Sequence, residues 1–161
     1  MIVDYNALPG TAKVWVYPSN RKFYDTEIEG IHEKIKTFLE RWKCDDENFQ
    51  VSYQFLYNRF IVFFADDSTT PLEIADIDAS VQFILQLQQE HKVDLLDKMN
   101  VCFKQGEYVQ YKDLKDFKKL LKNKAVTGKS IVFDNLITTK EEFDAYWEGP
   151  ISDSWYGRFV K

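Results

Sequence analysis

The sequence is poor in the residues that crosslink a chain, bind metals or break secondary structure. Its 161 residues include two cysteines, two histidines, six glycines and four prolines. Two cysteines are too few for a disulfide framework, and the scarcity of glycine and proline argues against disordered segments and long linkers. No apolar run approaches the roughly 18 residues that a membrane-spanning helix needs. These shortages exclude a disulfide-stapled scaffold and a helical membrane protein.

The beginning of the chain and its net charge predict where the protein works. Residues 1–6 contain neither a basic stretch nor an apolar core, so we expect no secretory signal peptide. Cys44 and Cys102 are expected to be reduced thiols, which favours a cytoplasmic protein. The net charge of −5 offers no general attraction to nucleic acid or to an anionic membrane. We therefore expect no membrane partner and disfavour nucleic acid as a partner.

Aromatic side chains, by contrast, are abundant. The chain holds 13 Phe, nine Tyr and four Trp, and 45% of its residues are hydrophobic. This length and composition are typical of one globular domain with a substantial core, so we predict a single domain over 1–161. Any Tyr or Trp that stays exposed belongs to the residue types that anchor protein interfaces.

The hydrophobic pattern predicts alternating strands and helices. Strands are expected over 11–18, 49–57, 60–65, 101–103, 108–111 and 130–133, with Asn58 and Arg59 in a hairpin turn. Helices are expected to begin at Asp25 or Thr26, at Asp78, at Asp113 and at Thr138. The first helix has one apolar stripe, made of Ile28, Ile31, Ile35, Phe38, Leu39 and Trp42. Both faces of 11–18 are apolar, which predicts a central strand.

The order of these elements predicts the α+β class, with helices packed on an antiparallel or mixed sheet. The N-terminal part reads strand, helix, strand, strand, helix, strand, which is the β-α-β-β-α-β order of ferredoxin-like folds. We therefore predict a ferredoxin-like core over 11–111 and a C-terminal α/β extension over 112–161. The tail, 151–161, carries Trp155, Tyr156 and Phe159, so we expect it to dock on the body of the protein.

One segment matches part of a nucleotide-binding motif without meeting its requirements. Gly128, Lys129 and Ser130 match the end of a P-loop, and 131–134 matches the strand and acidic residue of its partner motif. The P-loop pattern needs a glycine where this chain has Asn123. It also needs a helix after the motif, to hold the phosphate, whereas a strand is expected there. The sequence therefore argues against a nucleotide site.

The other candidate reactive side chains each have a simpler structural explanation. His32 is expected on the polar face of the first helix and His91 at the end of the second, where a cation meets the helix dipole favourably. Neither stands at a metal-ligand spacing from a cysteine. Cys102 lies in an apolar strand, which favours a buried, inert thiol, and Cys44 sits beside Asp45, whose charge does not favour a thiolate. We expect no metal site, no cofactor and no catalytic residue.

Two charged groups allow more than one interpretation. Asp76 and Asp78 flank Ile77, and paired carboxylates can bind a divalent cation or share a proton. The favoured explanation is that Asp78 caps the second helix and Asp76 lies in a solvated loop. The one basic cluster lies on and after the third helix and is either a solvated face or a patch for phosphate, nucleic acid or an acidic partner. It consists of Lys115, Lys118, Lys119, Lys122, Lys124 and Lys129.

Five segments spread over most of the chain carry a family resemblance. They are Val-Trp-Val-Tyr at 14–17, Ile-Asp-Ala-Ser-Val at 77–81, Val-Asp-Leu-Leu-Asp-Lys-Met-Asn-Val at 93–101, Phe-Lys-Gln-Gly-Glu-Tyr at 103–108 and Ile-Val-Phe-Asp-Asn-Leu at 131–136. With them the chain resembles a family of short bacterial proteins of similar length that often carry the label "ABC transporter ATPase". The resemblance implies no activity and no site residue, because an ABC ATPase needs an intact P-loop and a signature segment that this chain lacks.

The sequence leaves two main hypotheses about function. The first is a non-catalytic cytoplasmic module that binds a partner protein, or a second copy of itself as a homodimer, through exposed aromatic residues. The candidates for that surface are Trp15, Tyr17, Trp155 and Tyr156. The second is a small-molecule-binding protein or an enzyme with a pocket over the sheet. The candidate ligand-binding residues are Arg59, Asp78, Lys98, Asn100 and Lys104. Nucleotide binding, which the family label suggests, is the least favoured.

Overall fold

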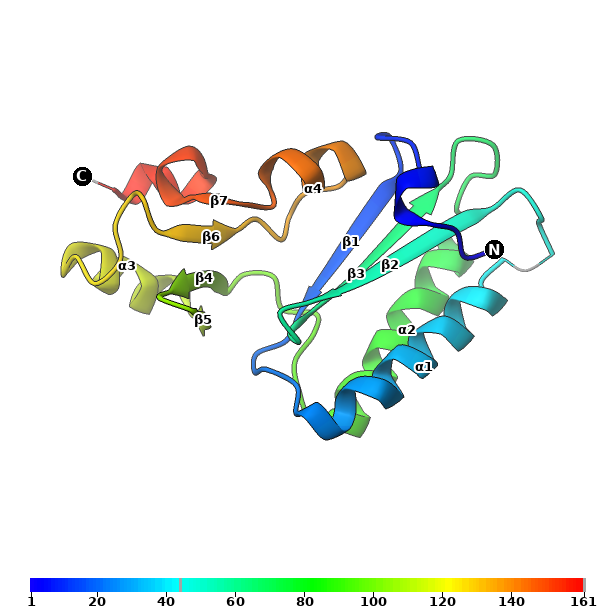
Figure 1. The fold of residues 1–161 in the computed structure, drawn as a ribbon, viewed down its shortest axis with the longest axis horizontal. Coiled ribbons are helices and arrows are strands. Elements are labelled where there is room, and N and C mark those ends of the chain that lie inside the picture. Colours follow the sequence, from blue (N-terminus) through cyan, green and yellow to red (C-terminus); the bar gives the residue numbers. More distant parts are fainter. Residues whose placement is uncertain (44, 161) are drawn as a thin grey trace.

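The computed structural model of the protein describes residues 1–43 and 45–160 and confirms the predicted α+β class (Figure 1). The first sheet, in the order β1-β3-β2, consists of β1 (Lys13–Pro18), β2 (Gln50–Leu56) and β3 (Phe60–Asp66). The second, in the order β5-β4-β6-β7, consists of β4 (Val101–Gln105), β5 (Tyr108–Lys112), β6 (Ile131–Phe133) and β7 (Glu148–Pro150). Both are antiparallel. The helices are α1 (Asp25–Arg41), α2 (Ile74–His91), α3 (Leu114–Lys122) and α4 (Lys140–Tyr146), and short 3-10 turns span Tyr5–Ala7, Ile151–Asp153 and Trp155–Phe159.

One face of the first sheet is covered by α1 and α2, which lie side by side in Figure 1. The predicted stripe of α1 faces this core, with Ile31, Ile35 and Leu39 fully buried. Because side chains alternate along a strand, Ile61 and Phe63 of β3 point to the same core. The local pattern of the sequence was therefore sufficient to identify this layer.

The other face of the first sheet is covered by the C-terminal half of the chain. Val14 and Val16 of β1 pack there in one cluster with Phe133 of β6 and with Phe143 and Trp147 from the α4 region. The prediction that β1 is a central strand was wrong, since β3 lies between β1 and β2. β1 is apolar on both faces because each face is covered by a different layer, not because strands flank it on both edges.

The ferredoxin-like prediction holds as far as α2 and fails at the fourth strand. In that fold the fourth strand would join the first sheet, but here β4 pairs with β5 and β6 in the second sheet. The free edge of β1 is instead met by the extension, where the Val14 N–H donates to the carbonyl of Thr138 at 3.0 Å. β4 is buried on both faces, with Cys102 against the first sheet and Phe103 against α3, which accounts for its place between the layers.

The helix starts were predicted with mixed accuracy. Asp113 caps α3, accepting a hydrogen bond from the Asp116 N–H at 2.7 Å. The starts of α1 and α4 differ by a residue or so from the prediction, within the usual uncertainty of helix ends. For α2 the prediction was wrong, because the helix begins at Ile74 after Glu73 and leaves Asp78 exposed within it. The Asp76 carboxylate accepts the Glu73 N–H at 2.8 Å, so Asp76 takes the capping role.

The tail docks as predicted, with the ring of Tyr156 5.4 Å from that of Phe117. Gly128–Ser130 forms a turn after α3 and before β6, so the P-loop order of strand, motif and helix is reversed. The prediction for Cys44 lies outside the described residues. No helix within 1–43 or 45–160 is both long and apolar enough to cross a membrane.

Candidate functional site

A groove lined by acidic residues lies where α4, β6, β7 and the first residues of the tail meet. Its volume is about 530 Å³. Four carboxylates line it, and among its described lining residues there is no lysine, arginine or histidine. The four are Asp134, Glu142, Glu148 and Asp153. We call this cavity the acidic groove.

Two aromatic side chains stand at the acidic groove and remain exposed. Tyr146 ends α4 and is 68% exposed, and Trp155 opens the last 3-10 turn and is 52% exposed. The turn is fixed by Ser154, whose hydroxyl accepts the Tyr156 N–H at 3.1 Å and donates to the Ile151 carbonyl at 2.7 Å. The guanidinium of Arg158 lies 4.2 Å from the centroid of the Trp155 ring. Trp155 is thus exposed but held in place.

The four carboxylates differ in how far they are already engaged, and Asp134 accepts the Leu136 N–H at 3.1 Å. Glu142 accepts hydrogen bonds from Thr138 and Thr139 at the start of α4, and these bonds lower the pKa of its carboxyl. Glu148 lies 3.4 Å from the Lys104 ammonium. Asp153 has no hydrogen-bond or ion-pair partner in the part of the chain that the structure describes. The acidic groove therefore keeps at least one carboxylate available for a ligand.

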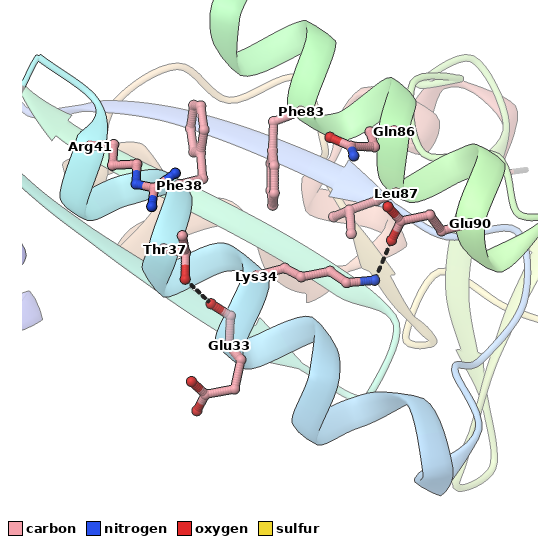
Figure 2. Close-up of a pocket in the computed structure, with 9 residues that line it drawn as sticks. All are labelled: Glu33, Lys34, Thr37, Phe38, Arg41, Phe83, Gln86, Leu87 and Glu90. Atoms are coloured by element: carbon pink, nitrogen blue, oxygen red, sulfur yellow. Dashed lines mark hydrogen bonds and ion pairs between the residues drawn. The ribbon is translucent and has the colours of Figure 1, made fainter.

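A second cavity, of about 420 Å³, lies between α1 and α2 on the side away from the sheet (Figure 2). Its wall is the stacked pair Phe38 and Phe83, whose ring centroids are 4.6 Å apart at an interplanar angle of 11°. Lys34 and Glu90 form an ion pair at its rim, where Figure 2 shows charged groups of both signs. The cavity is a shallow gap between two helices, and its rim favours no particular charge.

A third cavity, of about 610 Å³, carries the opposite charge. It lies between α3 and the tail and is lined by Lys118, Lys122 and Lys124. The ammonium of Lys118 lies 4.3 Å from the centroid of the Phe159 ring. Three lysines of the predicted basic cluster therefore line one cavity. Of these, Lys122 lies in the last turn of α3, where a cation also stabilises the helix dipole without any ligand.

No family model, curated protein or solved structure matches this chain. The family resemblance therefore stays a prediction.

The predicted ligand-binding residues are not brought together in one cavity. Lys98 lies with its ammonium 5.5 Å from the Tyr17 ring, and Asn100 donates to Asp97 and to the Tyr111 hydroxyl at 2.9 and 3.0 Å. Lys104 contacts Glu148, and Asp78 is exposed on α2. Arg59 lies in a separate cavity beside β5. Within 1–43 and 45–160, no three His, Cys, Asp or Glu side chains are grouped closely enough to hold a metal ion.

Of the four predicted interaction residues, the structure leaves Trp155 exposed. Tyr17 is buried, and Trp15 and Tyr156 are half-buried, with Trp15 in an edge contact with Trp42. The reasoning from sequence did not identify Tyr146 or the carboxylates around it. A signal was present, because 134–153 contains six acidic residues and a single lysine. These are Asp134, Glu141, Glu142, Asp144, Glu148 and Asp153, against Lys140.

Proposed function

We propose that the protein is a non-catalytic interaction module that binds a lysine- or arginine-rich segment of a partner protein in the acidic groove. One observation carries the proposal: Tyr146 and Trp155 are exposed at a groove whose charged lining is entirely acidic. Exposed Trp and Tyr supply much of the binding free energy in protein interfaces. Arg158 already lies over the Trp155 ring, so an incoming cationic side chain would meet the exposed Tyr146 ring and a carboxylate.

The state of Glu142 supports binding rather than proton transfer. Hydrogen bonds lower the pKa of Glu142, so this group is ionised at neutral pH. A general acid needs the opposite, a carboxyl whose pKa is raised toward the working pH. Cys102 gives no nucleophile, because burial raises the pKa of its thiol to about 12. Glu142 therefore acts as a fixed negative charge in the acidic groove.

A display selection with random extended peptides tests the proposal, followed by calorimetry on the selected sequences. We expect lysine and arginine to be enriched, and we expect Trp155→Ala and Asp153→Lys each to weaken binding by about tenfold or more. Glu40→Lys makes the same charge change on exposed α1 and serves as the control. A selection without basic residues, or equal effects of Asp153→Lys and Glu40→Lys, would contradict the proposal.

A second copy of the chain is an alternative occupant, because Lys118 and Lys122 of one molecule complement the acidic groove of another. Light scattering at low and high salt separates the two cases. Self-association that disappears in Lys118→Glu/Lys122→Glu would assign the acidic groove to a homomeric contact. A monomer at all salt concentrations leaves the separate partner as the occupant.

We keep the cytoplasm as the proposed location. The support is the sequence argument about thiols, together with the buried and unpaired state of Cys102.

A further inference from the structure

Arg59 lines a cavity that is distinct from the acidic groove. Tyr57 also lines this cavity, and its hydroxyl donates a hydrogen bond to Glu148 of the acidic groove. The cavity has a volume of about 450 Å³ and lies between the β2–β3 turn and β5. The backbone of Arg59 is fixed, since its N–H donates to the Leu56 carbonyl and its carbonyl accepts the Ser19 N–H, both at 3.0 Å. The position of the Arg59 side chain therefore follows from the hairpin.

Few of the N–H groups of the Arg59 guanidinium are hydrogen-bonded within the described part of the chain. Its Nη1 donates to the carbonyl of Val109 at 2.8 Å. Its Nε is buried without a hydrogen-bond partner in the described part of the chain. No described carboxylate lies within 4.0 Å of it, although such a partner is usual for a half-buried arginine. Arg59 thus has hydrogen-bonding capacity that the protein itself does not fill.

The positive charge of Arg59 also has no counter-charge. Burial lowers the pKa of its guanidinium, and the ionisable groups that oppose this effect are Cys102 and Tyr111. Burial raises the pKa of both, that of the thiol to about 12, so both are neutral at pH 7. A desolvated charge without a partner costs folding free energy. Such costs are typical of binding sites, where a ligand supplies the missing charge.

The remaining lining of the cavity suits an anion with an apolar body. Lys22 adds a second cation, and Tyr57 and Tyr108 add exposed aromatic surface. Glu107 also lines the cavity; it is exposed on the turn between β4 and β5. The volume lies within the range of small-molecule sites.

We propose that Arg59 and Lys22 bind the oxyanion of a small molecule, a phosphate or a carboxylate, whose body lies against Tyr57 and Tyr108. The planar fork of an arginine matches both groups, and the Nη2 donors, which have no hydrogen-bond partner in the described residues, would satisfy the oxyanion. The site shares no lining residue with the acidic groove, and the hydrogen bond from the Tyr57 hydroxyl to Glu148 joins the two. It is a binding site, and no chemical step is assigned to it.

Calorimetry and thermal unfolding with inorganic phosphate, phenyl phosphate and benzoate test the proposal. We expect saturable binding, with phenyl phosphate tighter than inorganic phosphate because its ring adds contact with the tyrosines. Tighter binding of phenyl phosphate than of benzoate assigns the site to phosphate, and the reverse order assigns it to a carboxylate. If none of the three probes binds saturably, the proposal is overturned.

Arg59→Met provides the sharper test. This variant removes an uncompensated charge, so we expect its melting temperature without ligand to equal or exceed that of the unmodified protein, while probe affinity falls at least tenfold. Arg158→Met makes the same change outside the cavity and should bind normally. If Arg59→Met does not fold, Lys22→Gln is measured in its place, since Lys22 is exposed and its replacement should not affect folding. We expect this variant to lose probe affinity several-fold. Normal binding by the folded Arg59→Met variant, or by Lys22→Gln in its place, would overturn the assignment.

Discussion

Replacing Glu27 by glutamine should destabilise the protein through one partly buried polar network. The network joins the start of α1 to the end of α2. Arg21 donates to both carboxylate oxygens of Glu27, at 3.0 and 3.2 Å, and Nδ1 of His91 lies 2.7 Å from Oε2. The N–H of Tyr24 donates to Oε1 at 2.8 Å. Glutamine keeps an oxygen for the Tyr24 bond but loses the charge that Arg21 pairs with.

The size of the effect follows from the pKa of Glu27. Hydrogen bonding to Arg21, foremost, lowers that pKa from 4.5 to about 2. One pKa unit corresponds to about 1.4 kcal/mol, which sets an upper limit of roughly 3 kcal/mol. The side chain is 15% exposed, so solvent screens part of the interaction, and we expect a loss of about 1–2 kcal/mol. For a chain of this size that loss corresponds to roughly 2–8 °C in melting temperature.

The pH dependence gives the same prediction a definite sign. A carboxyl whose pKa is lower in the folded state contributes its full stability above the unfolded pKa and loses it as the pH falls toward the folded pKa. For Glu27 this window runs from about pH 4.5 down to about pH 2. Urea unfolding of Glu27→Gln should therefore show a flatter decline of stability in this window than the unmodified protein. Glu29→Gln, on the same helix and exposed, is the control, and equal behaviour of the two variants would refute the reasoning.

Two further predictions concern packing and reactivity. A side chain at Gly157 would place its Cβ 2.6 Å from the Ser152 carbonyl oxygen, so Gly157→Ala should lose about 1–3 kcal/mol in urea unfolding. Gly30→Ala, where nothing lies within 4 Å on a helix, should instead gain about 0.5–1 kcal/mol, and the opposite order would contradict the packing described here. Burial and the raised pKa of its thiol should protect Cys102 from iodoacetamide at pH 7.5 until the protein is unfolded. Peptide mass mapping checks this, and alkylation of Cys102 in the folded protein would be the contrary result.

The sequence predicted the elements whose signal is local. The apolar stripe of α1 repeats at helical spacing, and β3 is an unbroken apolar run, so both were identified from their own residues. Asn58 has the positive φ expected of the hairpin turn, at 51°. Such patterns are sufficient because one stretch of chain carries the whole signal.

The elements that were missed depend on partners far away in the sequence. The strand β7 contains Gly149 and Pro150, and from the sequence alone these residues predict the end of a helix. The segment is a strand because it pairs with β6. The early start of α2 includes Ile74, which is 80% exposed and belongs to no apolar stripe. The sheet membership of β4 is likewise a property of the packed layers rather than of its own residues.

In the candidate site, too, some residues could be identified from the local sequence and others only from the tertiary structure. Trp155 was identified because its residue type indicates an interface anchor, but nothing local showed that Tyr17 would be buried. Asp134, Tyr146 and Asp153 are brought together by the β6–β7 pair and the turn that follows it. Their proximity required the tertiary structure, although the density of acidic residues in 134–153 was visible beforehand.

Mapping the bound peptide by amide chemical shifts would test the central claim most directly. A basic peptide obtained by selection would be titrated into isotope-labelled protein, and the backbone amides that shift would be placed on the structure. We predict that the largest shifts cluster at 134–137 and 145–155, around the acidic groove. Shifts centred on the gap between α1 and α2, or on the lysines of α3, would contradict the account.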